Sequence, residues 1–76
     1  MTREAQTLLA YLSSRADRNT GRGSVLLADL RLLLFEATRP DRRRDTDDYL
    51  REIDNAGSLF DVTQKDGLLW YRVEKD

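Results

Sequence analysis

Residues 50–59 read LREIDNAGSL, and this stretch joins the end of an amphipathic helix to the start of a strand. The apolar residues Leu50, Ile53 and Ala56 recur at the spacing of one helix face. Gly57 follows them, at the position where helices commonly end in a left-handed residue. The stretch therefore predicts a helix that ends near Ala56, followed by a strand from Leu59. The buried side of this helix is expected to carry Tyr49, Leu50, Ile53 and Ala56.

The start of the same helix has two alternatives. With Asp45 as the N-cap, Asp47 and Asp48 place negative charge in the first turn, where the helix dipole favours it. Alternatively, the helix begins at Asp41 and uses the following arginines as its first turn. We prefer Asp45. The preceding helix must end before Pro40, because a residue that precedes proline disfavours the α conformation.

The C-terminal part of the chain predicts a β-hairpin. Segments 59–64 and 68–73 flank Asp66–Gly67, a strong signal for a type I′ turn. A two-residue loop would place three cross-strand pairs on one face: Phe60–Val73, Val62–Tyr71 and Gln64–Leu69. The other face would carry Leu59, Asp61, Thr63, Lys65, Leu68, Trp70 and Arg72, with Asp61 facing Arg72. A longer loop with a glycine bulge would change the partners and turn Trp70 inward.

Two further helices are expected in the first half. Helix 3–16 begins after the N-cap Thr2 and is followed by a polar loop over 17–23. Ser24 then caps a helix over 26–37, or Ser24–Val25 forms a very short strand. The two apolar stripes comprise Ala5, Leu8, Leu9, Leu12 and Ala16 in the first helix, and Leu26, Leu27, Leu30, Leu33, Leu34 and Ala37 in the second.

Composition allows one small domain, residues 1–76, with 39% hydrophobic and 36% charged residues. The chain has no cysteine and no histidine, which excludes disulfide scaffolds, zinc fingers and thiol catalysis and removes the commonest general base. We therefore expect no enzymatic activity, no cofactor and no metal site. No apolar run approaches the roughly 20 residues of a membrane span, and no charged leader precedes an apolar segment. These features favour a cytoplasmic protein without membrane contact.

The order of three helices and a hairpin is that of winged helix-turn-helix domains. Residues 50–59, the turn Asp66–Gly67 and the segment 70–73 resemble the third-helix-to-wing part of small winged-helix transcriptional repressors. Those proteins commonly carry a leucine-x-x-leucine-x-x-alanine-glycine-leucine pattern, a turn glycine and an aromatic-rich last strand. The resemblance covers residues 45–73 in detail. It implies an α+β winged helix-turn-helix fold with a two-stranded C-terminal wing and room for a short third strand.

The resemblance also implies a small regulator that binds double-stranded DNA. The third helix would lie in the major groove, with Arg51 and Asn55 at base edges. Residues 38–44 carry a net charge of +3, and Arg42, Arg43 and Arg44 among them would contact phosphates, as would Lys65 at the tip of the wing. The predicted DNA-binding residues are Arg42, Arg43, Arg44, Thr46, Arg51, Asn55 and Lys65.

The charge of the third helix supports an alternative. Residues 45–57 carry a net charge of −4, and Asp47, Asp48 and Asp54 would face DNA phosphates. The alternative is a protein-interaction module, an adaptor or inhibitor, whose acidic helix binds a basic partner or mimics nucleic acid. A homodimer is also expected, because Leu32 and Phe35 lie off the core stripe of their helix. The candidate interface residues are Leu32, Phe35 and Trp70.

Overall fold

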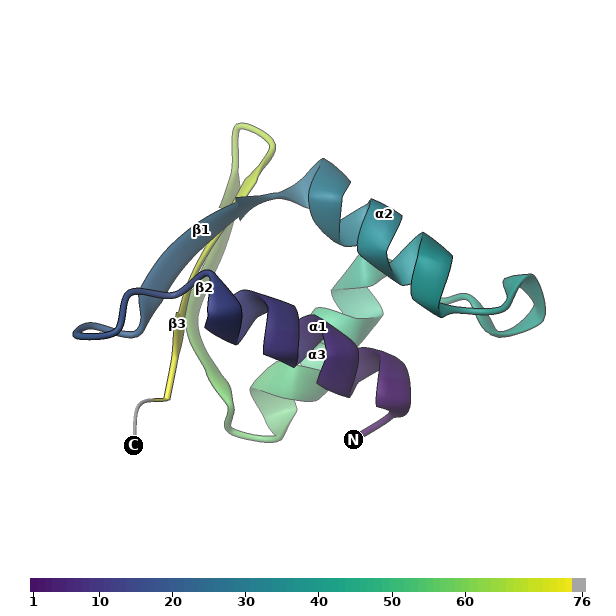
Figure 1. The fold of residues 1–76 in the computed structure, drawn as a ribbon, viewed down its shortest axis with the longest axis horizontal. Coiled ribbons are helices and arrows are strands. Elements are labelled where there is room, and N and C mark those ends of the chain that lie inside the picture. The colour runs from purple at the N-terminus through teal and green to yellow at the C-terminus, as the bar shows by residue number, and fades with distance from the viewer. Residues whose placement is uncertain (75–76) are drawn as a thin grey trace.

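A computed structural model describes residues 1–74 of the chain. These residues form three α-helices, one short 3-10 helix and one antiparallel sheet, and the helices gather on one side of the sheet (Figure 1). The sheet order is β1-β3-β2, so the last strand of the chain lies in the middle. The predicted α+β fold is confirmed. The elements are α1 (Arg3–Ser14), β1 (Arg22–Leu26), α2 (Leu27–Ala37), η1 (Pro40–Arg42), α3 (Thr46–Asn55), β2 (Leu59–Lys65) and β3 (Leu68–Val73).

One hydrophobic core lies between the helices and the inner face of the sheet. The helices contribute leucines at the predicted spacing, and Ile53 of α3 and Leu30 of α2 are fully buried. Leu26, Ala37 and Ala56 were expected in the core but are exposed. The core residues are Ala5, Leu8, Leu12, Val25, Leu30, Leu34, Tyr49, Leu50, Ile53, Leu59, Leu69, Tyr71 and Val73.

Strand β1 is longer than the Ser24–Val25 strand that the sequence suggested, and Ser24 is not a helix cap. Because successive side chains in a strand alternate between faces, Val25 is buried while Leu26 points to the other side. Helix α2 therefore starts one residue later than expected. No side chain caps the N-terminus of α2. Instead, the backbone N–H of Leu27, the first residue of α2, donates to the carbonyl oxygen of Gly67 in the hairpin turn at 2.9 Å.

The predicted boundaries of the other helices are largely confirmed. Thr2 caps α1, with its Oγ1 accepting from the N–H of Ala5 at 3.2 Å, although α1 ends at Ser14 rather than at residue 16. Asp45 is the N-cap of α3 by backbone conformation, and its carbonyl oxygen accepts from the N–H of Asp48 at 3.0 Å. The alternative start at residue 41 is wrong, because η1 forms a separate turn there. Gly57 has a φ of +77° and ends α3 as predicted.

The hairpin has the predicted two-residue turn but not the predicted register throughout. Gln64 pairs with Leu69 as expected, and Trp70 lies on the outward face. The strand register then shifts by one residue between Phe60 and Thr63, and the predicted Val62–Tyr71 pair falls within this irregular stretch. Leu59, and not Phe60, therefore pairs with Val73, and Leu59 is buried. The predicted Phe60–Val73 pair and the predicted outward position of Leu59 are both wrong.

Asp61 explains the shift. Its φ of +54° places it in the left-handed region, and a β-bulge there sets two residues of β2 against one residue of β3. Phe60 and Asp61 consequently both lie beside Arg72. The Nε of Arg72 donates to Oδ2 of Asp61 at 3.1 Å, and its guanidinium carbon lies 4.6 Å from the centre of the Phe60 ring. The expected contact between Asp61 and Arg72 is thus present, although by a different register.

Strand β1 packs closely against β3 at one point. Gly23 pairs with Tyr71, whose hydroxyl crosses over it and donates to the carbonyl oxygen of Leu12 at 2.6 Å. Burial raises the pKa of Tyr71 above its ordinary value of 10.0, which keeps the hydroxyl protonated as a donor. The contact ties the sheet to α1.

Candidate functional site

The outward side of α3 is acidic. Its inward side is formed by Tyr49 and the apolar residues of the core, which leaves the carboxylates of Asp47, Asp48 and Asp54 exposed. We call these three residues the acidic face. The side-chain amide of Gln64 donates to Oδ1 of Asp47 at 2.8 Å, so strand β2 holds one end of this face in place.

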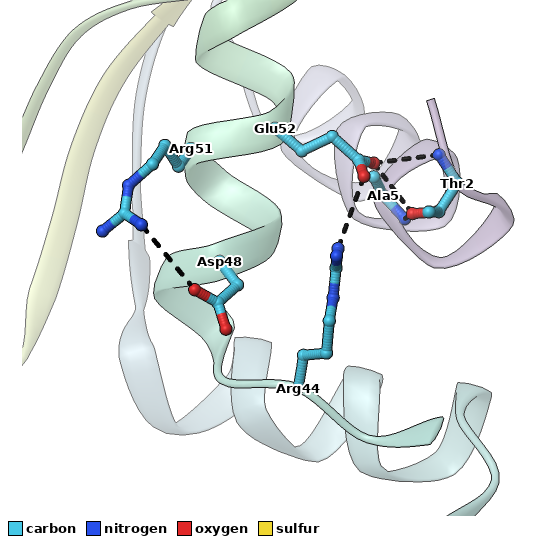
Figure 2. A network of polar contacts seen from close by, with 6 residues as sticks. All are labelled: Thr2, Ala5, Arg44, Asp48, Arg51 and Glu52. Atoms are coloured by element: carbon cyan, nitrogen blue, oxygen red, sulfur yellow. Dashed lines mark hydrogen bonds and ion pairs between the residues drawn. The ribbon is translucent and has the colours of Figure 1, made fainter.

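Arg51 is the cation closest in sequence to the acidic face. Its Nη1 lies 3.8 Å from Oδ1 of Asp48, one helical turn away (Figure 2). Both side chains are well exposed, so the pair is weakly held and partly screened by solvent. Arg51 therefore offsets the charge of Asp48 only in part, and within residues 1–74 no cation pairs with Asp47 or Asp54.

Arg44 and Glu52 form a second polar network, on the side of α3 that meets α1 (Figure 2). Oε2 of Glu52 accepts from the backbone N–H of Thr2 at 2.9 Å and from its hydroxyl at 2.8 Å. Oε1 of the same carboxylate accepts from Nη2 of Arg44 at 3.3 Å. The guanidinium of Arg44 also lies 4.4 Å from the ring centre of Tyr49. This network joins the N-terminus of α1 to α3.

The Glu52 network should make stability depend on pH. Hydrogen bonds from the backbone N–H and then the hydroxyl of Thr2, together with Arg44, hold the pKa of Glu52 below its ordinary value of 4.5. A carboxylate with a lowered folded-state pKa stabilises the fold above its unfolded pKa, and this contribution is lost as pH falls through the folded value. Glu52→Gln should therefore lower the thermal midpoint near neutral pH, and the difference from wild type should shrink as pH falls below 4.5.

Glu36→Gln is the matched control for this measurement, because the Glu36 side chain is exposed and forms no hydrogen bond or ion pair within residues 1–74. Thermal unfolding followed by circular dichroism at a series of pH values compares the two variants. A difference between Glu52→Gln and wild type that stays constant through the acidic range would contradict the role given to the carboxylate.

Arg43 has a partner within the fold. Its Nη2 donates to the carbonyl oxygens of Phe35 and Thr38, each at 3.2 Å, and its guanidinium lies 4.0 Å from the Phe35 ring centre. These are unpaired carbonyls at the end of α2, where a cation is favourable. Arg43 thus caps the C-terminus of α2 and joins it to the segment that leads to α3.

The other predicted DNA contacts are spread over the surface. Thr46 is half-buried and lines a groove of about 540 Å³ between α2 and the start of α3. Asn55 is exposed at the end of α3. Arg42 and Lys65 are exposed, and neither side chain pairs with another residue in the described part of the chain. The structure therefore leaves Arg42 and Lys65 free, while Arg43 and Arg44 are engaged internally.

The three candidate interface residues lie on two elements. Leu32 and Phe35 are 57% and 58% exposed on α2, and Trp70 is 49% exposed on β3. Leu26 adds to this exposed apolar surface, although the sequence placed it in the core. The alternation Arg22-Gly23-Ser24-Val25-Leu26 is the signal that could have identified it as an outward strand residue. Homodimerisation remains a prediction.

No family model matches the chain, and the searches of curated proteins and of solved structures returned no match. Residues 1–74 hold no group of three or more carboxylates with the geometry of a metal site. None of the helices in that range combines the length and the apolar character that crossing a bilayer requires.

Proposed function

We propose that the chain is a winged-helix module that binds a basic surface of a partner protein through the acidic face of α3. The element order α1-β1-α2-α3-β2-β3, the left-handed Gly57 after α3 and the Asp66–Gly67 turn support the fold assignment. The assignment makes α3 and the β2–β3 hairpin the surfaces that such a domain offers to its partner.

The observation that carries this proposal is the distribution of charge around α3. Three carboxylates point outward, while Arg43 and Arg44 direct their guanidinium groups to α2 and to Glu52. Within residues 1–74, the cation that pairs with a carboxylate of the acidic face is Arg51, through Asp48. A DNA backbone would be repelled by such a surface, whereas a basic protein surface would be attracted to it and steered toward it.

A second candidate is double-stranded DNA, and the unpaired side chains of Arg42 and Lys65 favour it. In this reading both residues contact phosphates. Each lost phosphate contact should reduce the slope of log K against log salt by about 0.9. Wild-type binding to duplex DNA, with a slope that falls in Arg42→Ala and Lys65→Ala, would therefore replace the first proposal.

The test neutralises the acidic face. Wild type should bind a fluorescent nona-arginine peptide at about 50 mM salt, and the triple variant Asp47→Asn, Asp48→Asn, Asp54→Asn should bind it roughly tenfold more weakly. Exposed ion pairs contribute up to about 1 kcal/mol each, and 1.4 kcal/mol corresponds to tenfold in affinity. Fluorescence anisotropy over a salt series measures both quantities.

The matched control removes the same charge from another part of the surface. Asp29→Asn, Glu36→Gln and Asp41→Asn change three exposed carboxylates that lie before α3 in the sequence. This variant should retain peptide affinity within about twofold. Equal losses in the two triple variants would show that net charge alone attracts the peptide, and the acidic face would then have no special role.

A further inference from the structure

The outward face of the sheet carries a regular array of side chains that the acidic face of α3 does not involve. Leu69, Tyr71 and Val73 of β3 point into the core, and Tyr71 reaches α1, so the alternate residues point away from the helices. Trp70 is the middle one of the outward-pointing residues of β3, which is the central strand of the sheet. The outward residues of β3 are Leu68, Trp70 and Arg72.

The side chains beside Trp70 on the two neighbouring strands are short. Its cross-strand partners are Ser24 on β1 and Thr63 on β2, and both are exposed. A hollow of about 290 Å³ adjoins the indole, close to the smallest volumes of ligand pockets. Because no tall side chain stands on either side, a planar group can reach the exposed indole.

Cations flank the tryptophan along the strands. Arg22 and Arg72 pair across β1 and β3 at one end of the face, and Lys65 stands opposite Leu68 at the other end. Asp61 is the carboxylate at an outward position of these strands within residues 1–74, and it is shared by Arg72 at 3.1 Å and Arg22 at 3.7 Å. The outward strand positions are therefore net positive, although the whole chain has a net charge of −1.

The carboxylates of Asp66 and Glu74 lie in the turn and directly after β3, outside the rows that flank Trp70. Residues two apart on one strand are separated by about 7 Å. The row of Arg22 and Arg72 therefore lies about 7 Å along β3 from Trp70, which is near enough for a base to stack on the indole while a phosphate beside it reaches that row. Ser24 and Thr63 place hydroxyl groups beside the indole, where they can bond the edge of a stacked base, and the apolar pair Leu26–Leu68 lies in the next row toward the turn.

We propose that this outer sheet face binds single-stranded nucleic acid, with a base stacked on Trp70 and phosphates beside Arg22 and Lys65. Aromatic platforms among cations are the usual means of binding unpaired strands, since every base offers a flat face to stack. A duplex hides those faces within its own stack and cannot use the platform. The site is separate from the acidic face and does not rest on it.

Trp70 is the only tryptophan of the chain, so its fluorescence reports directly on this site. An oligothymidylate of about 12 nucleotides, within the range of known site sizes, should quench that fluorescence in wild type at about 50 mM salt. With a labelled oligonucleotide, Trp70→Ala should bind roughly tenfold more weakly, because one stacked base is lost. Arg22→Gln with Lys65→Gln should weaken binding and flatten the salt dependence, while Trp70 remains as the reporter.

The control is Arg31→Gln with Arg39→Gln, which removes the same charge away from the sheet and should retain affinity within about twofold. Circular dichroism and thermal midpoints establish that each variant is folded. The acidic-face triple variant should still bind the oligonucleotide, so a failure of one proposal is distinct from a failure of the other.

Three results would overturn the inference. The first is the absence of quenching by the single strand at low salt. The second is equal or tighter binding of a duplex of the same length. The third is a concentration-dependent shift of Trp70 emission without nucleic acid, together with a dimer in sedimentation, which would show that a second copy covers the face.

Discussion

Replacing Leu30 or Ile53 with alanine should lower the free energy of unfolding by about 2–5 kcal/mol. Both side chains have no exposed surface, and they come from two different helices that meet in the core. The loss combines the transfer of buried methyl groups with the cost of the cavity left behind. A domain of 76 residues has a total stability of roughly 4–11 kcal/mol, so either change removes a large part of it. Urea unfolding followed by circular dichroism measures the effect.

Leu32→Ala is the matched control for these substitutions. It removes the same atoms as Leu30→Ala from the same helix, but Leu32 is exposed, so its loss should stay within about 0.5 kcal/mol. A loss below about 1 kcal/mol for both Leu30→Ala and Ile53→Ala would show that the core does not lie where the structure has it.

Gly23→Ala should destabilise the fold by about 1–3 kcal/mol, the usual cost of overfilling a packed site. A Cβ at position 23 would lie 2.7 Å from the Tyr71 hydroxyl oxygen and 3.1 Å from the backbone carbonyl oxygen of Arg15. The tyrosine cannot withdraw without breaking its buried bond to Leu12, which would leave its own hydroxyl without an acceptor. Gly57 provides a contrast: no atom lies within 4 Å of its Cβ position, and its constraint is the positive φ.

A double-mutant cycle isolates this contact. Tyr71→Phe alone should be destabilising, because the Leu12 carbonyl loses the shorter of its two hydrogen bonds and keeps the one from the N–H of Arg15 at 3.3 Å. In the Gly23→Ala background the same change also removes the closest clashing atom, so its cost should be smaller. Strictly additive effects would mean that the alanine is accommodated by a movement elsewhere, and the contact would not be a constraint.

The sequence predicts the helices well because their apolar spacing reflects burial directly. The stripes through Leu8 and Leu12, and through Leu50 and Ile53, are confirmed. The hairpin turn is confirmed for the same kind of local reason, since Asp66 and Gly67 both adopt positive φ. The predicted register beyond it is wrong, because the bulge at Asp61 brings its carboxylate to Arg72 of β3 and Arg22 of β1, and the second of these contacts forms only when all three strands are assembled.

The candidate site shows the same division between local features, which the sequence predicts, and tertiary contacts, which it does not. The exposed carboxylates of α3 follow from its helical spacing, and the structure leaves them outward as the sequence implied. The use of the arginines could not be predicted, because their partners are set by tertiary structure. Arg44 meets a carboxylate that also binds Thr2, 50 residues away in the sequence. A run of arginines therefore indicates available charge, and the fold decides how much of it faces outward.

The strand order also constrains how the chain can acquire its structure. Strands β1 and β2 each pair with β3, which is the last of the three to be synthesised. Partners in the β1–β3 pair are up to 50 residues apart, so the sheet requires a long loop closure that slows folding. On the ribosome, β1 must wait with both edges unpaired until residues 68–73 have emerged. Folding of this domain is therefore expected to be a late, concerted event rather than a stepwise one along the nascent chain.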